Sequence, residues 1–327
     1  MPAFLSRIPP AGVEWAVKTR EDRGTTVRET LAYAVPGELA GCRLDRFLRA
    51  MLPGLPAKSV RFAIDAGDVA VEGRRGRKGG FLRAGDEVVV RRIAEPEDWL
   101  PLPGPLPGAA VLYADADVAV LGKPADAHTE PQRPREEGTL AGFLRSLYPG
   151  VVAISMAPGL TLLTRLDYST SGAVPAALSP DAFSFLSRER EKGRIEKTYL
   201  CLVQGRMDEG MSLSFLLETE GGRKVRARKD RREEDPLYWT AVSPVRRAGE
   251  CTLARAVISK GKRHQIRAHL AAAGFPIVGD RRYGTVPPEG PGARRLMLHA
   301  EEVRFTHPAS KETLRVVAPP PAEFEAI

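Results

Sequence analysis

A Pro-rich segment in the first third of the chain sets the domain organisation of this sequence. Residues 94–108 contain five prolines, at positions 96, 101, 103, 105 and 107. Proline lacks an amide hydrogen and has a fixed φ, so the segment suits neither a helix interior nor a central strand. It predicts a semi-rigid, extended spacer. We therefore expect an N-terminal extension (1–37), a small domain (38–93), a Pro-rich linker (94–108) and a larger domain (109–327).

The composition is globular, with a local excess of positive charge. The chain has 327 residues, of which 43% are hydrophobic and 28% charged, and its formal net charge is +8. Residues 38–93 hold 12 Arg and Lys against 7 Asp and Glu, and residues 221–232 hold 7 against 1. Basic clusters of this kind favour a polyanionic partner such as a nucleic acid.

The cysteines and the apolar runs indicate the compartment. Cys42, Cys201 and Cys251 lie far apart without a CxxC pair, which favours free thiols in a reducing compartment. No run approaches the roughly 18 apolar residues of a membrane span, and no apolar signal-peptide core stands at the N-terminus. We expect a cytoplasmic protein that does not associate with a membrane.

The small domain is expected to be an α/β unit. Apolar residues at positions 44, 47, 48, 51 and 52 share one face of a helix that ends at Pro53-Gly54. A second helix is expected over 59–66. Strands are expected at 69–71 and 87–90, with a basic loop after the first of them, and a further strand at 26–33.

The larger domain is expected to be α+β. Many strands with few intervening helices favour a mixed, largely antiparallel sheet with flanking helices over a doubly wound parallel sheet. Helices are expected at 140–147 and 181–191, and strands at 111–113, 118–121, 197–203, 213–217, 238–242, 252–258 and 314–317.

Asp167 is the leading candidate for a catalytic side chain. It follows an apolar run and precedes a Thr-Ser-Gly turn. In an extended backbone, residues two apart project to the same side, so Arg165 and Asp167 can reach one pocket. A carboxylate held at a strand end suits a nucleophile or general base. The alternative is an Asp that starts a turn, with Thr170 and Ser171 capping a following helix, and this segment alone leaves both open.

A second block, residues 261–274, predicts a short helix that ends at Gly274. Arg267 can point from its first turn into a cleft while Ile266 packs beneath. His264 and His269 are five residues apart, about 140° around a helix axis, so they do not share a face as zinc ligands do. We therefore expect no metal, which also disfavours a metal-dependent nuclease. The sequence has neither the G-x-S-x-G elbow of a serine hydrolase nor a phosphate-binding P-loop.

Residues 41–45, 66–73 and 82–88 resemble the S4 RNA-binding domain. The resemblance implies that cations on the helices and the basic loop contact an RNA backbone, where each neutralised phosphate releases counterions. The alternative is a solvated basic face on an ordinary small α/β unit. The expected RNA-binding residues are Arg43, Arg46, Lys58, Arg61, Arg74, Arg75, Arg77 and Lys78.

The larger domain resembles the RluA-type pseudouridine synthases over about residues 109–319. The segments that carry the likeness occur in the family's order and spacing, and an S4 domain ahead of the catalytic domain is a common arrangement in it. These segments are residues 165–172, 197–205, 264–270, 295–300 and 305–308.

The resemblance implies roles for individual residues. Asp167 matches the aspartate that attacks the target nucleoside, on either the base or the ribose. Tyr199 matches the tyrosine that stacks on the base near the C5 proton, and Arg267 the basic residue that pairs with the aspartate. The substrate pocket is expected to include Ile266, His264 and Arg165, the last as the arginine that fills the space left by the flipped nucleotide.

The resemblance also implies the partner. The expected substrate is ribosomal RNA or, second, tRNA, held by the small domain and by Arg223, Lys224, Arg226 and Arg228. Isomerisation transfers no electrons and adds no group, so we expect no cofactor. We also expect no obligate protein partner.

The sequence departs from the family pattern at several positions. Thr164 stands where His is common, and Asp126 follows Lys123-Pro124 where Gly is usual. Lys262-Arg263 replaces the commoner Arg-Thr, and Pro175 interrupts an expected strand or helix start. These departures motivate the alternative hypothesis, an RNA- or ribosome-binding factor that kept the fold and lost turnover.

Overall fold

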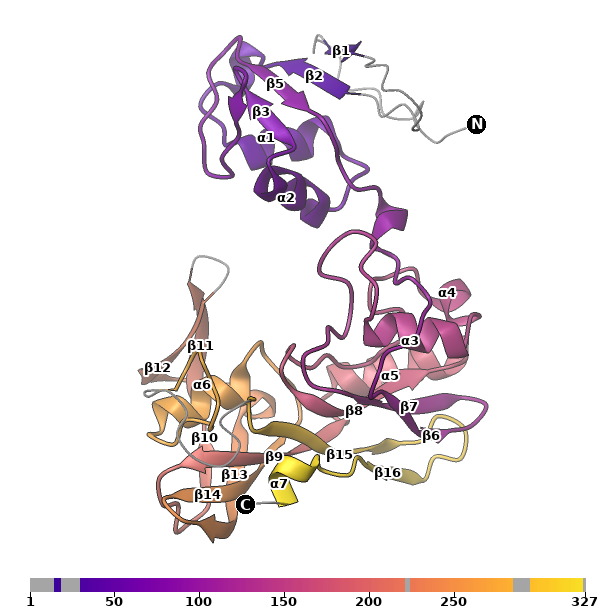
Figure 1. Ribbon diagram of the computed structural model, residues 1–327, viewed down its shortest axis with the longest axis vertical. Coiled ribbons are helices and arrows are strands. Elements are labelled where there is room, and N and C mark those ends of the chain that lie inside the picture. The colour runs from indigo at the N-terminus through magenta and orange to yellow at the C-terminus, as the bar shows by residue number, and fades with distance from the viewer. Residues whose placement is uncertain (1–14, 19–29, 221–223, 285–294, 326–327) are drawn as a thin grey trace. The chain divides into compact units, whose positions relative to one another are not determined.

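The computed structural model describes residues 15–18, 30–220, 224–284 and 295–325 (Figure 1). The chain separates into two compact units, called here the first and the second unit. The first unit comprises residues 1–100 with 133–135, and the second unit comprises residues 101–132 with 136–327. The division falls between Leu100 and Pro101, inside the Pro-rich segment.

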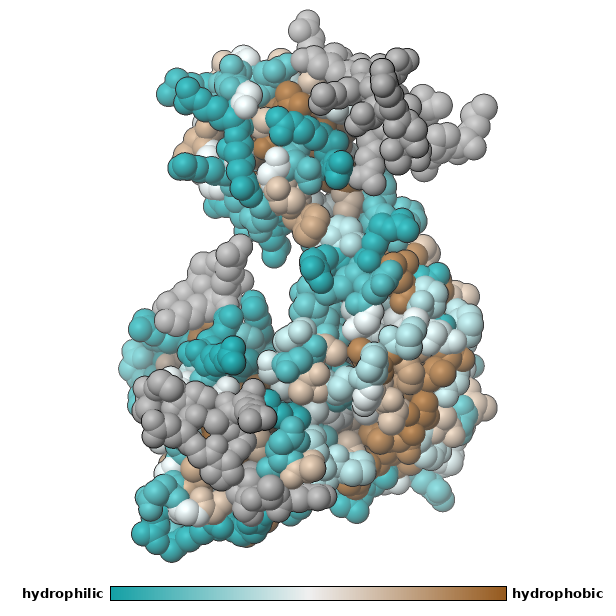
Figure 2. Space-filling model, in the orientation of Figure 1, coloured by the Kyte–Doolittle hydropathy of each residue, from teal (hydrophilic) through white to brown (hydrophobic). Residues whose placement is uncertain are grey.

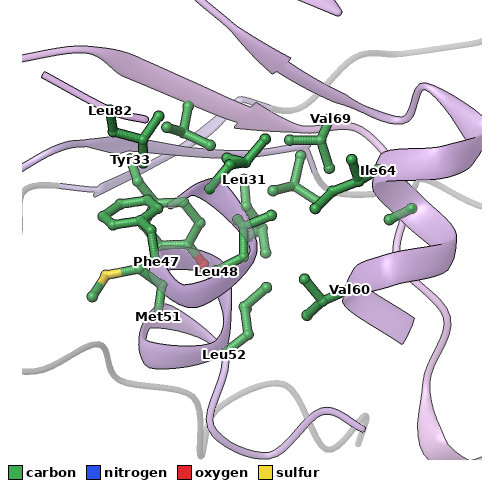
Figure 3. Close-up of a cluster of buried hydrophobic side chains, with 14 of the residues drawn as sticks. Leu31, Tyr33, Phe47, Leu48, Met51, Leu52, Val60, Ile64, Val69 and Leu82 are labelled. Atoms are coloured by element: carbon green, nitrogen blue, oxygen red, sulfur yellow. The ribbon is translucent and has the colours of Figure 1, made fainter. Parts of the chain in front are cut away.

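The first unit packs two helices on a small antiparallel sheet. Its strands follow the order β1-β2-β5-β3-β4. Phe47, Leu48 and Ile64 point from the helices into a core that also contains Leu31 and Val69 (Figure 3). The helices are α1 (Leu44–Met51) and α2 (Ala57–Ala66), and the strands are β1 (Trp15–Lys18), β2 (Thr30–Ala34), β3 (Val69–Val71), β4 (Arg74–Arg75) and β5 (Glu87–Val90).

Two features of this unit differ from the sequence-based expectation. Strand β2 pairs with β5 and contributes Leu31 and Tyr33 to the core, so the unit includes residues ahead of 38. Arg74 and Arg75, expected in a loop, form β4 and pair with β3. The connection is a two-residue hairpin turn in which Glu72 and Gly73 have φ of 49° and 71°, the left-handed conformation that such turns require.

The Pro-rich segment is packed rather than a free spacer. Residues Pro96–Trp99 form a 3₁₀ turn, and the buried indole Nε1 of Trp99 donates to Ser59 Oγ at 2.8 Å, within the first unit. Within the second unit, the Pro101 carbonyl accepts a hydrogen bond from Arg145. The apolar residues between the prolines explain the difference, because burying their surface stabilises a packed segment over an extended one.

A nine-stranded sheet forms the second unit, with the order β10-β13-β14-β9-β15-β8-β7-β6 and β16 paired to β15. Among the described strands its pairings are antiparallel except for β15 with β8, which confirms the predicted α+β class. A separate two-stranded hairpin, β11–β12, lies beside α6 (Figure 1). The sheet strands are β6 (Ala110–Ala114), β7 (Val118–Lys123), β8 (Ser171–Ala177), β9 (Glu196–Gln204), β10 (Met211–Leu213), β13 (Thr240–Ala248), β14 (Cys251–Ile258), β15 (Leu298–Thr306) and β16 (Thr313–Val317), and the hairpin strands are β11 (Phe215–Glu220) and β12 (Lys224–Arg232).

The helices of the second unit begin where the sequence offers capping residues. Thr139 and Ser179 accept hydrogen bonds from the backbone amides of the first turns of α3 and α5. The helices are α3 (Leu140–Leu147), α4 (Val151–Ile154), α5 (Pro180–Glu191), α6 (Gln265–Ala272) and α7 (Ala322–Glu325). Within the described residues no helix has the length and apolar character of a membrane span.

Strand β8 decides one of the alternatives left open by the sequence. It starts at Ser171, so Thr170 and Ser171 lead into a strand and do not cap a helix. Gly172 has φ of 121°, and an added Cβ would lie 2.2 Å from the Ala300 carbonyl oxygen; only glycine lets β8 and β15 approach this closely. Past Gly172, residues 161–163 lie along this side of β8, and the Leu163 amide donates to the Pro175 carbonyl at 2.9 Å. Pro175 fits because the Leu163 carbonyl accepts from Arg190 and so does not depend on an amide at position 175.

Candidate active site around Asp167

The segment that carries Asp167 is fixed on both sides by buried hydrogen bonds. The Thr129 hydroxyl donates to the Leu166 carbonyl at 3.0 Å and accepts from the Leu166 amide at 3.1 Å. The Thr170 amide donates to the Asp167 carbonyl at 3.0 Å and closes a turn. Asp167 therefore presents its carboxylate, 25% exposed, from a backbone with little freedom.

Arg267, in the first turn of α6, joins two carboxylates. Its Nη1 donates to Asp167 Oδ2 at 2.7 Å, while Nε and Nη2 donate to Asp280 Oδ2 and Oδ1 at 2.8 and 2.9 Å. Burial by itself would lower the pKa of Arg267, but the hydrogen bonds and charges of the two carboxylates raise it above its ordinary value. The guanidinium is thus held in a fixed orientation with one N–H directed at Asp167.

Asp280 is the buried anchor of this arrangement. Its side chain is 0% exposed, and Oδ1 also accepts from the amides of Arg282 and Tyr283 at 2.9 and 3.1 Å. Burial alone would raise the pKa of Asp280, but these hydrogen bonds and the Arg267 charge hold it below its usual range. Gly279 has φ of 77°, and a Cβ there would lie 1.8 Å from the Arg295 carbonyl oxygen, so the turn that aims Asp280 requires glycine.

His264 lies near the same oxygen of Asp167 that Arg267 contacts. Its Nε2 is 3.9 Å from Asp167 Oδ2, and its Nδ1 is 3.0 Å from the hydroxyl of Tyr283. That hydroxyl donates to the Val225 carbonyl of β12 at 3.2 Å. Burial lowers the pKa of His264 to about 4, although the charge of Asp167 raises it, so the imidazole is neutral at pH 7.

Tyr199 and Ile266, the two apolar residues expected in the pocket, are both buried. Tyr199 comes from β9 and is buried, and burial followed by the negative charge of Asp167 raises its pKa above the ordinary tyrosine value. Its hydroxyl is therefore protonated at neutral pH. Ile266 is buried at the start of α6.

Arg165 is placed differently from Asp167. Its Nη1 pairs with Glu130 Oε1 at 2.5 Å, and its side chain is 70% exposed. The two side chains expected in one pocket thus have different ion-pair partners, because residues 164–170 form a loop rather than a regular strand.

The basic residues predicted to bind RNA lie mostly at the surface of their own units. In the first unit Lys58 is half-buried over the Trp99 ring, 4.0 Å from its centroid. In the hairpin, Arg226 is exposed and Arg228 pairs with Glu218 and Asp230. Arg223 and the side chain of Lys224 lie outside the described residues. The exposed members in the first unit are Arg43, Arg46, Arg61, Arg74, Arg75, Arg77 and Lys78.

Comparison with known proteins places the chain in a family. Residues 117–272 match the family model described as RNA pseudouridylate synthase. The chain is 34% identical over 305 residues to ribosomal large subunit pseudouridine synthase C of Salmonella typhimurium, covering 88% of this chain and 92% of that protein. The chain belongs to the RNA pseudouridylate synthase family. It is 30% identical over 307 residues to ribosomal large subunit pseudouridine synthase D of Xanthomonas campestris, covering 90% of each chain.

A solved structure agrees with this assignment. Human RNA pseudouridylate synthase domain containing 1 superposes with a TM-score of 0.53 at 28% identity, over 67% of this chain and 86% of that one. The predicted RluA-type family is therefore confirmed, and the protein is an isomerase of the pseudouridine synthase class.

The structure explains how this pseudouridine synthase accommodates Asp126. The residue has φ of 57°, the left-handed conformation for which glycine is the default and which Asp tolerates better than most side chains. The departure from the family's Lys-Pro-x-Gly pattern is thus compatible with the same backbone path.

Sequence reasoning assigned no role to Lys123, Asp280 or Tyr283. Lys123 is buried, and its Nζ donates to the carbonyls of Pro124, Ala127 and Tyr168 at 2.7, 2.7 and 3.1 Å. It thereby ties the end of β7 to the residue after Asp167. The available signals were the Lys-Pro pair and the sequence Gly-Asp-x-x-Tyr-Gly at 279–284, whose spacing places two polar side chains in one turn.

Replacing Lys123 by Met is expected to destabilise the protein by about 2–4 kcal/mol, because three backbone carbonyls lose the donor that a buried lysine supplies. The carboxylate of Asp167 should also lose its fixed orientation, so the turnover rate falls together with thermal stability. Thermal melts and single-turnover rates check both effects. The matched control is Lys311→Met, which changes an exposed lysine on the same unit; equal melting temperatures for the two variants would contradict the role of Lys123.

A cavity of about 340 Å³ is lined in part by this lysine but does not include Asp167. Lys123, Ser171, Arg295 and His299 are among its lining residues, and Asp167 is not. Both ring nitrogens of His299 already have partners, Ser171 Oγ at 2.9 Å and the Ala318 carbonyl at 3.1 Å. Throughout the described part of the chain, no group of three or more His, Cys, Asp or Glu side chains is placed to hold a metal ion.

Proposed function

We propose that this pseudouridine synthase isomerises uridines of structured RNA, ribosomal RNA first, with Asp167 as the nucleophile. The observation that carries the proposal is the Asp167–Arg267–Asp280 arrangement, in which a buried, bidentate ion pair orients a guanidinium onto one partly exposed carboxylate. Relatives that cover nine-tenths of the chain are named for the large ribosomal subunit. Such a substrate favours a cytoplasmic enzyme.

The reaction requires no group from outside. The N1–C1′ bond of uridine breaks, a C5–C1′ bond forms, one proton leaves C5 and one proton is added at N1. Asp167 starts this sequence by attack on the nucleoside, and it needs an ionised carboxylate in a site that excludes water. Arg267 donates a charge-assisted hydrogen bond to that carboxylate.

Asp280 sets how strongly the guanidinium of Arg267 interacts with Asp167. Two of the three observed guanidinium hydrogen bonds go to Asp280 and one goes to Asp167. The buried positive charge is thereby shared between the two carboxylates, and only one of the three hydrogen bonds is directed at Asp167. A carboxylate paired with Arg267 alone would be a weaker nucleophile.

Tyr199 and Ile266 receive the flipped base. Extracting a nucleotide from its stack costs a few kcal/mol, which stacking on an aromatic ring offsets. The hydroxyl of Tyr199 is protonated, so it is a hydrogen-bond donor available to the polar groups of the base. Arg165, exposed on the loop that carries Asp167, is available to occupy the space that the flipped nucleotide leaves.

The first unit acts as an S4-like RNA-binding domain, and the basic residues of the β11–β12 hairpin contact the RNA backbone close to the site. Seven of the eight candidate cations in the first unit are exposed, and most of its visible surface is hydrophilic (Figure 2). Each phosphate contact releases counterions, so affinity should fall steeply with salt.

Phe81 gives this RNA-binding proposal a sharp test. Its side chain is 74% exposed, and its backbone forms an antiparallel bridge with Arg43, which places the two side chains on one face. An aromatic ring beside a guanidinium suits an unpaired base with its phosphate. Phe81→Ala should weaken RNA binding about tenfold, measured by filter binding, whereas Phe81→Trp should keep the affinity and show fluorescence quenching by RNA.

The control for Phe81 is Met156→Ala, another exposed apolar residue, on the second unit. It should leave RNA affinity unchanged. Equal affinities of folded Phe81→Ala and wild-type protein would remove Phe81 from the RNA surface.

The enzymatic proposal is tested by site-resolved pseudouridine mapping. Ribosomal RNA from a deletion strain, treated with purified protein, should gain pseudouridine at discrete positions that are modified in the parent strain. Folded protein that modifies neither ribosomal RNA nor tRNA would refute the proposal. The alternative, a binding factor without turnover, is not favoured by the named relatives; it predicts that Asp167→Asn rescues the deletion strain as well as wild type does.

A further inference from the structure

His264 has a ring nitrogen for which the proposed isomerisation gives no role. Nε2 faces the nucleophile at 3.9 Å from Asp167 Oδ2, and Nδ1 faces the Tyr283 hydroxyl at 3.0 Å. The imidazole is held rigidly, because its side chain is 9% exposed and packs edge-on against the Tyr283 ring. A rigid nitrogen beside the nucleophile is placed to touch the substrate.

The hydrogen-bond chain behind the ring assigns its tautomer. A tyrosine hydroxyl has one proton, and that of Tyr283 donates to the Val225 carbonyl. Its oxygen therefore accepts from Nδ1–H of His264. A neutral imidazole carries one N–H, so Nε2 is left with a lone pair.

Two acceptors then face one another across the site. The carboxylate of Asp167 and the lone pair of Nε2 repel mildly when nothing lies between them, and a hydrogen-bond donor on the substrate removes that repulsion. A buried acceptor that meets a substrate donor also penalises analogues without the donor, because the acceptor is then left unpaired.

The chemistry of the reaction identifies the donor. Asp167 attacks either C1′ of the ribose or the base carbon bonded to N1, so with either target its oxygens lie beside the N1–C1′ bond. The ribose 2′-hydroxyl is carried by C2′, the immediate neighbour of C1′. The other donor of the nucleoside, N3–H, lies on the far edge of the base.

We propose that Nε2 of His264 accepts a hydrogen bond from the 2′-hydroxyl of the target uridine and thereby selects ribose over 2′-deoxyribose. The inference rests on the proposed function, since it needs a flipped uridine at Asp167. It assigns His264 a specificity role in addition to lining the pocket. The 2′-hydroxyl is the group that distinguishes RNA from DNA at a single nucleotide.

Two variants separate the side chain from the backbone. His264 has φ of 54°, so alanine would be strained there. His264→Gly removes the ring without strain, and His264→Asn tolerates the same backbone and keeps a carbonyl acceptor. Tyr283→Phe leaves the ring in place and removes the hydroxyl that fixes its tautomer.

The experiment uses three synthetic RNA oligonucleotides that span a ribosomal uridine modified by the full-length enzyme. The target carries uridine, 2′-deoxyuridine or N3-methyluridine, and single-turnover rates and RNA affinities are measured. Wild type should react at least about tenfold more slowly with 2′-deoxyuridine. The single-turnover rate of His264→Gly on uridine should be lower than that of wild type by a similar factor. On 2′-deoxyuridine the two enzymes should react at the same rate. His264→Asn and Tyr283→Phe should keep part of the preference.

Each other outcome overturns the inference. Wild-type enzyme that treats uridine and 2′-deoxyuridine alike has no such contact. A ribose preference that survives in His264→Gly assigns the contact to another residue. If His264→Gly instead loses only the discrimination between uridine and N3-methyluridine, His264 contacts the base. No reaction of wild type with any ribosomal RNA would instead refute the proposed function.

Discussion

Asp167→Asn should abolish isomerisation, with a loss of at least about 10³-fold in the single-turnover rate. Asparagine has nearly the shape of aspartate but lacks the charge and nucleophilicity that attack on the nucleoside needs. RNA affinity should change little, because the cations proposed to bind RNA lie elsewhere. Rates are measured by tritium release from C5-labelled RNA, and affinity by filter binding.

The matched control for this prediction is Asp181→Asn, an exposed aspartate on α5. It should retain wild-type rate and affinity. If Asp167→Asn turned over at a rate near that of wild type, Asp167 would not be the nucleophile, and the site would have to be assigned anew.

Asp280→Asn should lower kcat about 100-fold and leave KM for RNA nearly unchanged, because the substitution frees Arg267 to pair with Asp167 alone. The amide also places a donor against a guanidinium donor. Breaking a buried ion pair by removing one partner costs about 3–5 kcal/mol of folding stability. Steady-state kinetics and chemical denaturation measure the two effects separately.

The pH dependence of stability gives a second readout for Asp280. Its pKa in the folded protein is held below the ordinary value. Its stabilising contribution is therefore fully present above the unfolded pKa of about 4 and is lost as pH falls through the lower folded value. The difference in stability between wild type and Asp280→Asn should be constant from pH 5 to 7 and narrow below about pH 4.

An exposed ion pair provides the control. Glu196 pairs with Arg304 at 2.8 Å on the surface, and Glu196→Gln should cost no more than about 1 kcal/mol. An Asp280→Asn protein as active and as stable as Glu196→Gln would show that Asp280 does not position Arg267.

Local patterns predicted the secondary structure of the second unit well. The helix at 140–147 and the strands at 197–203 and 252–258 match α3, β9 and β14 within a residue or so, because their apolar periodicity is set by burial on one face. The hairpin turn at Glu72-Gly73 and the packing of the Pro-rich segment were missed. The hairpin is local, since Val71 pairs with Arg74 across the turn. The packing of the Pro-rich segment depends on partners distant in sequence, such as Trp99 with Ser59.

Motif spacing identified the residues of the site but not their connections. Asp167, Tyr199, Arg267 and His264 were each named from the sequence, and the structure brings them together. The anchoring role of Asp280 was not visible, because nothing in the order of residues indicates that a guanidinium 100 positions after Asp167 also meets a carboxylate 13 positions further on.

The sequence by itself determined the family, the α+β class and the identity of the candidate nucleophile, since these follow from short-range periodicity and from the spacing of matching segments. Only the tertiary structure decided how that carboxylate is oriented and with which side chain it pairs. Lys123, Asp280 and Tyr283 act through hydrogen bonds from buried or half-buried positions, and such bonds are specified by the three-dimensional packing that brings distant strands and turns together, not by any local pattern.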